Sequence, residues 1–235
     1  GLETGARVVE RLLEEKAYIN YVRRRGRLAL QTGFSDAGRF VGQIAATLAI
    51  ERLHHGIAEA IGNSELKGVE TLIFSTHGES MGRGAHSGSM HTRLHYVFSD
   101  EARRRFARFG IPIKHETSFQ GGDGYLFFAN RRLTTRALAT VIMDGEVPPD
   151  GEDPFYEDTD LRLDFIGRLR AYQEHLFAHP GYRAVLGAFG SNILFKTGSR
   201  PVKRQMDATG AVDRSAVSRM RAIPNNAILQ QFGYV

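Results

Sequence analysis

Residues 69–86 read VETLIFSTHGESMGRGAH, an apolar and β-branched segment that runs into a loop with three glycines. The apolar segment predicts a buried strand over 69–75. In the loop, glycine lets the backbone approach a ligand closely, and Arg83 offers a charged fork that suits carboxylate or phosphate. His77 and His86 can transfer a proton near neutral pH. The pattern indicates an active-site loop for an anionic substrate, although its spacing matches no P-loop, dinucleotide or zinc motif.

The same order of strand, polar loop and helix occurs on both sides of this stretch. Residues 28–32 predict a short buried strand that ends at Gly33, and residues 112–119 predict another that leads into QGGDG at 120–124. Helical periodicity extends over 3–24, 36–61 and 99–109. This alternation is typical of parallel β/α units, and in a (β/α)8 barrel the active site collects on the loops after the strands.

The second half of the chain is richer in helix. Residues 131–144 and 158–189 predict long helices, and the acidic, Pro/Gly-rich connector at 145–160 predicts an exposed loop. We therefore expect a helix-rich α/β fold: a partial (β/α)8, TIM-barrel-type segment with additional long helices. Residues 1–235 would form one segment, and because helical patterning begins at once without an initiator Met, we expect a piece of a longer protein.

Composition limits the class of protein. Hydrophobic residues make up 42% and charged residues 24% of the 235, which is ordinary for a globular protein. No apolar run approaches the ~20 residues that span a bilayer, so no membrane partner is expected. The absence of cysteine excludes disulfides and thiolate metal sites and favours the cytoplasm. A metal ion would need oxygen or imidazole ligands.

The net charge of +5 derives largely from two arginine clusters, at 23–27 and 103–108. Such clusters are found on nucleic-acid-binding surfaces, but no nucleic-acid motif accompanies them. Solvated helix faces are the favoured interpretation, with Phe106 and Phe109 on the buried side of the second cluster. We expect no nucleic-acid partner.

Each remaining candidate has a functional and a structural interpretation. Asp36 could bind Mg²⁺ or Mn²⁺, or could cap the helix that follows it. Arg39 in the first turn opposes the helix dipole, which is easier to understand if it faces an anion. The QGGDG segment could be an ordinary turn, and the basic loop TGSRPVKR at 197–204 could be a surface turn or an anion site. The other histidines show no partner spacing and are interpreted as surface or core residues.

Taken together, these pieces resemble the phosphoenolpyruvate carboxylase family. GFSDAGRFVG at 33–42 is similar to the family's Gly-Tyr-Ser-Asp strand end, and residues 77–84 resemble its glycine loop, shortened by about two residues. Gln120-Gly121 is similar to its Gln-Gly element. Residues 198–204 match its Gly-Ser-Arg-Pro-x-Lys-Arg letter for letter, and MRAIP at 220–224 resembles its Leu-Arg-Ala-Ile-Pro. The motifs follow the family's order through nearly the whole chain.

The resemblance implies a reaction and a set of roles. The family adds bicarbonate to phosphoenolpyruvate, with Mg²⁺ or Mn²⁺, and releases oxaloacetate and phosphate. Carried over by motif, Asp36 matches a metal-binding carboxylate, and His77 matches the histidine that assists carboxyphosphate breakdown. Arg83 matches an arginine of the carboxylation step, and Arg39 replaces an active-site lysine. Arg200 matches a cation that binds the substrate phosphate, and Gln120 is a bicarbonate-side candidate.

The chain also departs from the family. Arg39 keeps the charge of the lysine but not its ability to donate a proton. The first arginine of the glycine loop has no counterpart, and Asn225 replaces a tryptophan. We expect a catalytic segment that is inactive in isolation and belongs to a homo-oligomer in its full-length form. The alternatives are a non-catalytic paralogue that binds anionic metabolites or acts as a regulatory subunit, and another barrel lyase acting on a 2-oxo acid.

Overall fold

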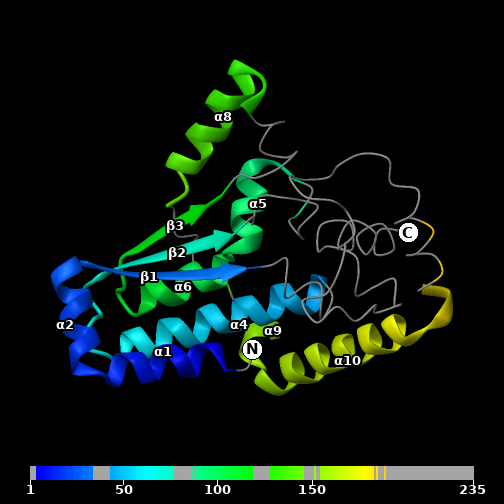
Figure 1. The fold of residues 1–235 in the computed structure, drawn as a ribbon, viewed down its shortest axis with the longest axis horizontal. Coiled ribbons are helices and arrows are strands. Elements are labelled where there is room, and N and C mark those ends of the chain that lie inside the picture. The colour runs from blue at the N-terminus through cyan, green and yellow to red at the C-terminus, as the bar shows by residue number, and fades with distance from the viewer. Residues whose placement is uncertain are drawn as a thin grey trace, which may run out of the picture.

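The computed structural model describes residues 4–33, 43–76, 86, 88–118, 128–145, 151, 154–182, 184 and 188 of the chain. Within them the fold is α/β and rich in helix, and a small parallel sheet of three strands lies at its centre (Figure 1). The strands are β1 (Arg27–Gly33), β2 (Glu70–Thr76) and β3 (Ile113–Thr117). The three strands predicted from the sequence are therefore confirmed.

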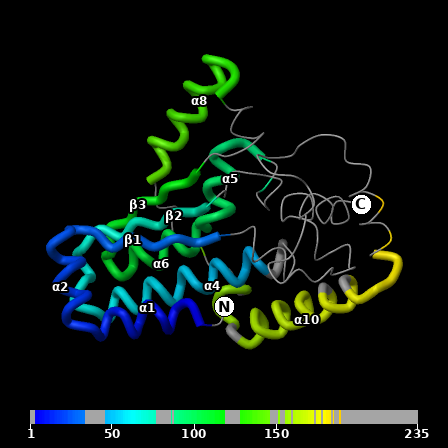
Figure 2. Tube along the Cα trace, viewed as in Figure 1, coloured from blue at the N-terminus to red at the C-terminus, as the bar shows by residue number. Residues whose placement is uncertain are grey.

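Consecutive strands are neighbours in the sheet, in the order β1-β2-β3. The crossover from β1 to β2 contains α4 (Gln43–Gly62), and the crossover from β2 to β3 contains α5 (Met90–Val97) and α6 (Asp100–Arg108). Figure 2 follows this path from blue into green. α5 was not predicted. Its eight residues are too few for a clear periodic pattern, and its start is fixed by the Ser89 side chain, which accepts a hydrogen bond from the Thr92 amide.

The predicted helix over 3–24 is divided in two, α1 (Gly5–Glu14) and α2 (Lys16–Arg25). Glu15 between them is extended, with φ −81° and ψ 107°. The division allows Val9 and Leu13 of α1 and Ile19 and Val22 of α2 to be buried in the same core. Gly26, with a φ of 69°, then ends α2 in the left-handed conformation and directs the chain into β1.

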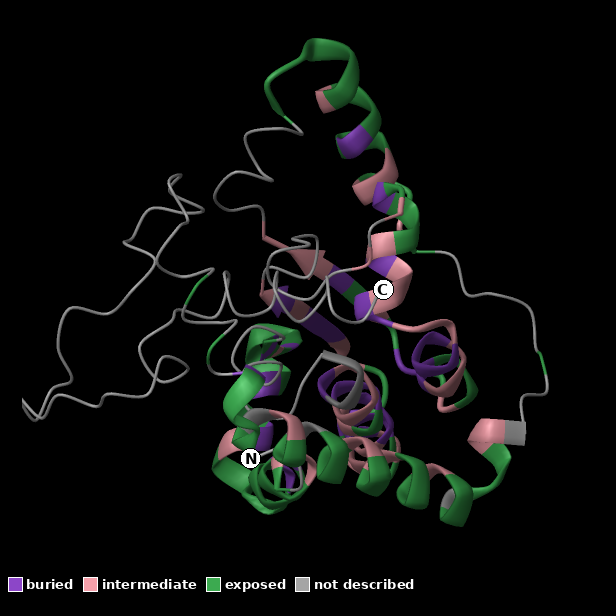
Figure 3. Cartoon of the chain, turned by 90° about the vertical axis from the view of Figure 1, so that its right-hand side faces the viewer, coloured by how far each residue is buried: buried purple, intermediate pink, exposed green. Residues whose placement is uncertain are grey.

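The core lies between one face of the sheet and the helices α1, α4 and α6, which Figure 1 shows on the same side. Leu28 and Ile73 from the strands meet Ile57 and Ile61 of α4 and Phe106 of α6 there. Purple residues in Figure 3 mark this buried layer. Burial of Phe106 confirms that the second arginine cluster lies on a helix with an apolar face.

The opposite face of the sheet is open in the described part of the chain. Ala29, Gln31 and Lys114 on this face are exposed and Phe74 is half-buried, whereas Leu72, which pairs with Ala29 and Lys114, is buried. Alternation along a strand explains the difference, because successive side chains point to opposite faces.

The helices α8 (Arg131–Ile142), α9 (Pro154–Glu157) and α10 (Thr159–Ala178) follow the sheet. α8 projects away from the sheet, and α10 packs along α4 (Figure 1). The predicted exposed loop at 145–160 is wrong in part, because it contains α9 and because Tyr156 is half-buried against α4. The predicted helix over 158–189 is interrupted at His179, which precedes Pro180 and takes an extended conformation. Of the described residues beyond it, 180–182, 184 and 188 are helical again. In the described residues, no helix is both long and apolar enough to span a membrane.

Candidate functional site

The ends of the three strands bring together the points from which three predicted loops begin. In the parallel register, Gly33 pairs with Thr76, and Ser75 pairs with Thr117. Neighbouring strands lie about 4.8 Å apart, so the three ends fall within about 10 Å of one another. In the sequence, Asp36 follows Gly33 by three residues, His77 follows Thr76 directly, and Gln120 follows Thr117 by three residues.

The predicted site residues themselves, Asp36, Arg39, His77, Arg83, Gln120 and Arg200, lie outside the described residues. Whether they meet around one substrate therefore stays a prediction. Within the described ranges, no three histidine, aspartate or glutamate side chains gather in a way that could hold a metal ion.

Side-chain hydrogen bonds hold the carboxyl end of β2 from both neighbouring strands. The Thr117 hydroxyl of β3 donates to the Ser75 carbonyl oxygen over 3.2 Å. The Gln31 amide of β1 donates to the Thr76 hydroxyl over 2.7 Å. These contacts supplement the backbone ladder at the last two residues before His77.

His86, at the far end of the glycine loop, has a structural contact. Its Nδ1 accepts a hydrogen bond of 3.0 Å from the Gly88 amide, and its ring centroid lies 5.6 Å from that of Tyr96. Gly88 has no room for a side chain, since a Cβ there would lie 2.9 Å from His86 Nδ1. His86 thus helps the chain turn into α5.

A buried polar chain that the sequence did not reveal lies behind the same strand ends. His115 of β3 contacts Ser75 Oγ through Nε2, at 3.1 Å, and Asp144 Oδ2 through Nδ1, at 2.8 Å. Arg103 of α6 donates to the other oxygen of Asp144 over 2.9 Å. Ser75, Arg103 and the side chain of Asp144 are at most 4% exposed, so this Ser75–His115–Asp144–Arg103 chain is buried. We call it the buried relay.

Charge determines which atoms carry protons in the buried relay. Burial lowers the pKa of His115 below its ordinary value, although the hydrogen bond to Asp144 acts in the opposite direction. Burial alone would raise the pKa of Asp144, but the hydrogen bond from His115 and the Arg103 guanidinium outweigh burial and hold that pKa below its usual range. An ionised Asp144 can only accept, so a neutral His115 donates from Nδ1 and accepts the Ser75 hydroxyl proton at Nε2.

This order of groups is that of a Ser–His–Asp catalytic triad. Ser75 has no exposed surface, however, and it lies on the helix-facing side of the sheet in line with Thr71 and Ile73. A nucleophile must reach its substrate, and Ser75 cannot. The buried relay is therefore a structural link between elements.

Arg103 corrects the sequence-based view of the second arginine cluster. The prediction of a solvated face is wrong for Arg103, which is 4% exposed and pairs with Asp144. The neighbouring Arg105 fits the prediction better, since it forms a partly exposed ion pair with Glu59. Asp144 is 41 residues from Arg103 and 29 from His115 in the sequence, so no local spacing could have revealed either contact.

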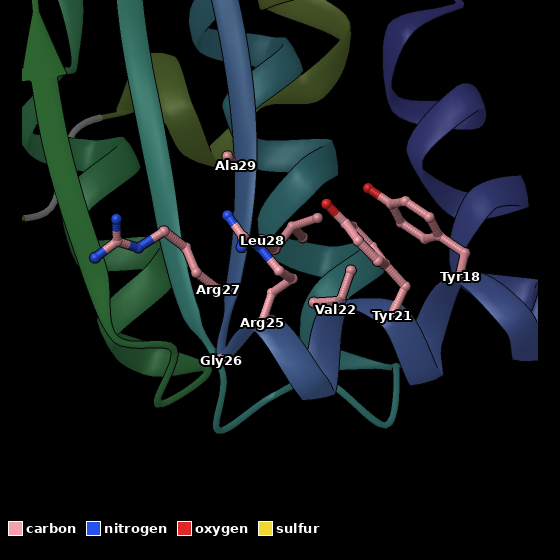
Figure 4. A pocket seen from close by; sticks show the side chains of 8 residues that line it. All are labelled: Tyr18, Tyr21, Val22, Arg25, Gly26, Arg27, Leu28 and Ala29. Carbon is pink, nitrogen blue, oxygen red and sulfur yellow. The ribbon is translucent and has the colours of Figure 1, made fainter.

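Two cavities lie away from the strand ends. One of about 390 Å³ is found at the start of β1, and its lining includes Tyr18, Tyr21 and Arg25 of α2 (Figure 4). Another of about 610 Å³ lies between α1, α4 and α10. There Tyr156 of α9 donates a 2.8 Å hydrogen bond to the buried carboxylate of Glu51, whose pKa is raised by burial. Neither cavity contains a residue of the predicted site.

No protein-family model matches this chain, and a search of curated proteins found no match either. Two observations therefore bear on function: the order of the motifs in the sequence and the alignment of the strand ends.

Proposed function

We propose that this chain is a catalytic segment of a phosphoenolpyruvate carboxylase-like enzyme, which converts phosphoenolpyruvate and bicarbonate into oxaloacetate and phosphate. The single observation that carries the proposal is the parallel register of Gly33, Thr76 and Thr117. This register supports it because the strand ends that lead into three motifs far apart in the sequence lie within about 10 Å of one another.

The proposal includes a (β/α)8 barrel, of which β1, β2 and β3 are one arc. The strand order β1-β2-β3 supports it, because consecutive strands are neighbours throughout a (β/α)8 barrel. The position of α4 and α6 on one face also supports it, since barrel helices form an outer ring. The open face, with Ala29, Gln31 and Lys114, then faces the barrel interior.

The reaction requires positive charge around two anions. A bicarbonate oxygen attacks phosphorus and the bond from phosphorus to the enol oxygen breaks, which gives carboxyphosphate and the enolate of pyruvate. Carboxyphosphate then divides into CO2 and phosphate, and the enolate carbon forms a bond to CO2. In this proposal Arg200 binds the phosphate, and Arg39 supplies a positive charge at the position of the family's active-site lysine. His77 assists the breakdown of carboxyphosphate, Arg83 serves the carboxylation step and Gln120 lies on the bicarbonate side.

Asp36 would hold Mg²⁺ or Mn²⁺. A carboxylate is the hard oxygen donor that these ions prefer, and the chain has no thiolate to compete for a softer metal. When bound, such an ion supplies positive charge beside an oxygen that becomes negative.

The test is fixation of labelled bicarbonate by the complete gene product with phosphoenolpyruvate and Mg²⁺, with oxaloacetate trapped by reduction. Arg200→Ala should lower kcat/KM by about 100-fold or more, as expected for loss of a phosphate contact. Arg168→Ala is the matched control, because Arg168 of α10 is 79% exposed and pairs only with the neighbouring Asp164 among the described residues. Wild-type protein that fixes no label would overturn the proposal.

A non-catalytic paralogue is the second candidate. The replacement of the family's lysine by Arg39 and the lack of the first loop arginine favour it. This candidate predicts that calorimetry detects binding of phosphoenolpyruvate by the complete protein while no labelled oxaloacetate forms.

A further inference from the structure

Three side-chain hydrogen bonds converge on the last two residues of β2. The Ser75 hydroxyl donates to His115, the Ser75 carbonyl accepts from Thr117, and the Thr76 hydroxyl accepts from Gln31. Two of these partners belong to β3 and one to β1. The end of β2, one peptide bond before His77, is thus held by side chains of both neighbouring strands.

The buried relay extends this support to the helices. Arg103 donates through Nε to the carbonyl oxygen of Phe98, 3.0 Å away, and its guanidinium lies 5.1 Å from the Phe98 ring centroid. His95 of α5 adds a second imidazole, with Nε2 3.7 Å from Asp144 Oδ1 and Nδ1 paired to Asp100. Asp144 therefore connects α5, α6, β3 and the turn after α8 through one carboxylate.

We propose that His115 is a positioning residue, which fixes the carboxyl end of β2 relative to β3 and to the turn after α8. Its two ring nitrogens are 2.8 and 3.1 Å from their partners, so one rigid ring sets the distance between Asp144 and Ser75. Both contacts are buried, so loss of either one leaves a polar atom without its partner. The role in catalysis rests on the proposed function, because His77 follows Thr76 directly.

Two variants separate the contacts of this ring. His115→Asn keeps an N–H close to the position of Nδ1, and so the bond to Asp144, but removes the acceptor of the Ser75 proton. Ser75→Ala removes the same hydrogen bond by deleting its donor, the Ser75 hydroxyl, and changes the side chain by only one oxygen atom. Thr71→Val is the matched control: Thr71 lies on the same face of β2, is 0% exposed, and its hydroxyl has no hydrogen-bond partner among the described residues.

Hydrogen exchange of the complete gene product is the first measurement. In Ser75→Ala and His115→Asn, the amides of the peptide covering 74–88 should exchange at least about tenfold faster, while those of α1 and α2 keep their wild-type rates. Thr71→Val should behave as wild type. An unchanged rate at 74–88, or a rise of equal size throughout the chain, would overturn the positioning role, because the buried relay would then contribute only to global stability.

Kinetics are the second measurement. At a temperature well below unfolding, both variants should lower kcat by about tenfold to 100-fold, with KM for phosphoenolpyruvate within about twofold of wild type. Faster exchange with an unchanged kcat would overturn the role in the reaction. If the wild-type protein fixes no bicarbonate, the proposed function fails, and the exchange rates alone decide whether His115 positions the strand end.

Discussion

His54 of α4 is an ionisable side chain with no exposed surface and no hydrogen-bond partner for either ring nitrogen among the described residues. Its ring meets Phe98 edge-on, with the centroids 5.0 Å apart. Burial, with the nearby His115 and His55, lowers the pKa of His54 to about 3. Burial and the charge of Arg105 lower the pKa of the adjacent His55 to about 3 as well.

These two histidines predict a stability that falls in mild acid. Below the ordinary histidine pKa of 6.5, His54 and His55 bind protons in the unfolded chain. In the folded chain they stay neutral down to about pH 3. The free energy of unfolding should therefore decrease between pH 6.5 and 5, by about 1.4 kcal/mol per pH unit for each histidine. Burial raises the pKa of Glu51, which acts in the opposite direction. Urea unfolding followed by circular dichroism across this range measures the slope.

His54→Leu is the variant that checks the cause. Removing two unpaired buried nitrogens should raise the free energy of unfolding at pH 7 by about 1 kcal/mol. Between pH 6.5 and 5 the number of protons taken up on unfolding should fall by about one, so the free energy of unfolding should depend less steeply on pH. A variant with the wild-type slope would show that His54 already carries a hydrogen bond or a proton in the folded state.

At this scale the contacts of single side chains could not be predicted from the sequence. His115 and His54 were interpreted as surface or core histidines, and burial of both confirms the core alternative. Their surroundings could not be predicted, because Ser75 and Asp144 reach His115 from 40 and 29 residues away. Arg103 stands in a run of arginines that looks solvated, and only the folded chain shows which member turns inward.

At the scale of elements, α4 is fitted closely to α1. A Cβ at Gly56 would lie 2.6 Å from the Cβ of Ala6, which a real side chain does not tolerate. Glycine inside a helix lowers its stability relative to alanine. At position 56 glycine is needed because α1 and α4 approach each other too closely for a side chain.

Gly56→Ala should therefore destabilise the protein by about 1–3 kcal/mol, because it forces α1 and α4 apart. Gly167 provides the opposite case, since it lies inside α10 and a Cβ there would meet no neighbouring element within 4 Å among the described residues. Gly167→Ala should stabilise by about 0.5–1 kcal/mol through helix propensity alone. Thermal unfolding of the two variants compares them directly, and a Gly56→Ala protein as stable as wild type would contradict the packing described for α1 and α4.

The elements themselves could largely be predicted, and their interruptions could not. Strands have strong signals here because apolar, β-branched runs end in glycine-containing segments, as at 69–84. The break at Glu15 has no such signal, because helical periodicity continues through it. The change of helix direction there depends on burial of residues from α1 and α2 in the same core. The end of α10 at Ala178 could have been predicted from Pro180, which disfavours helix at the residue before it.

At the scale of the whole molecule, the three strands have one covered and one open face. Helices cover Leu28, Ile73 and His115, while Ala29, Gln31 and Lys114 face outward in the described part of the chain. Lys114 forms an ion pair of 2.7 Å with Glu116 on this open face. The sequence predicted the order of the parallel units because each strand is followed by a helix. It could not show closure, which depends on contacts between distant strands.

Closure into a barrel makes a prediction about access to the open face. In a barrel, Ala29 points into the packed interior, so a cysteine at this position in the complete gene product should react with maleimide at least about 100-fold more slowly than one at position 168. Arg168→Cys is the control because Arg168 is 79% exposed on α10. This chain has no cysteine of its own, so mass spectrometry of the two peptides reports the introduced thiols alone. Equal rates for Ala29→Cys and Arg168→Cys would mean that the sheet stays open, and the barrel on which the proposed active site depends would be ruled out.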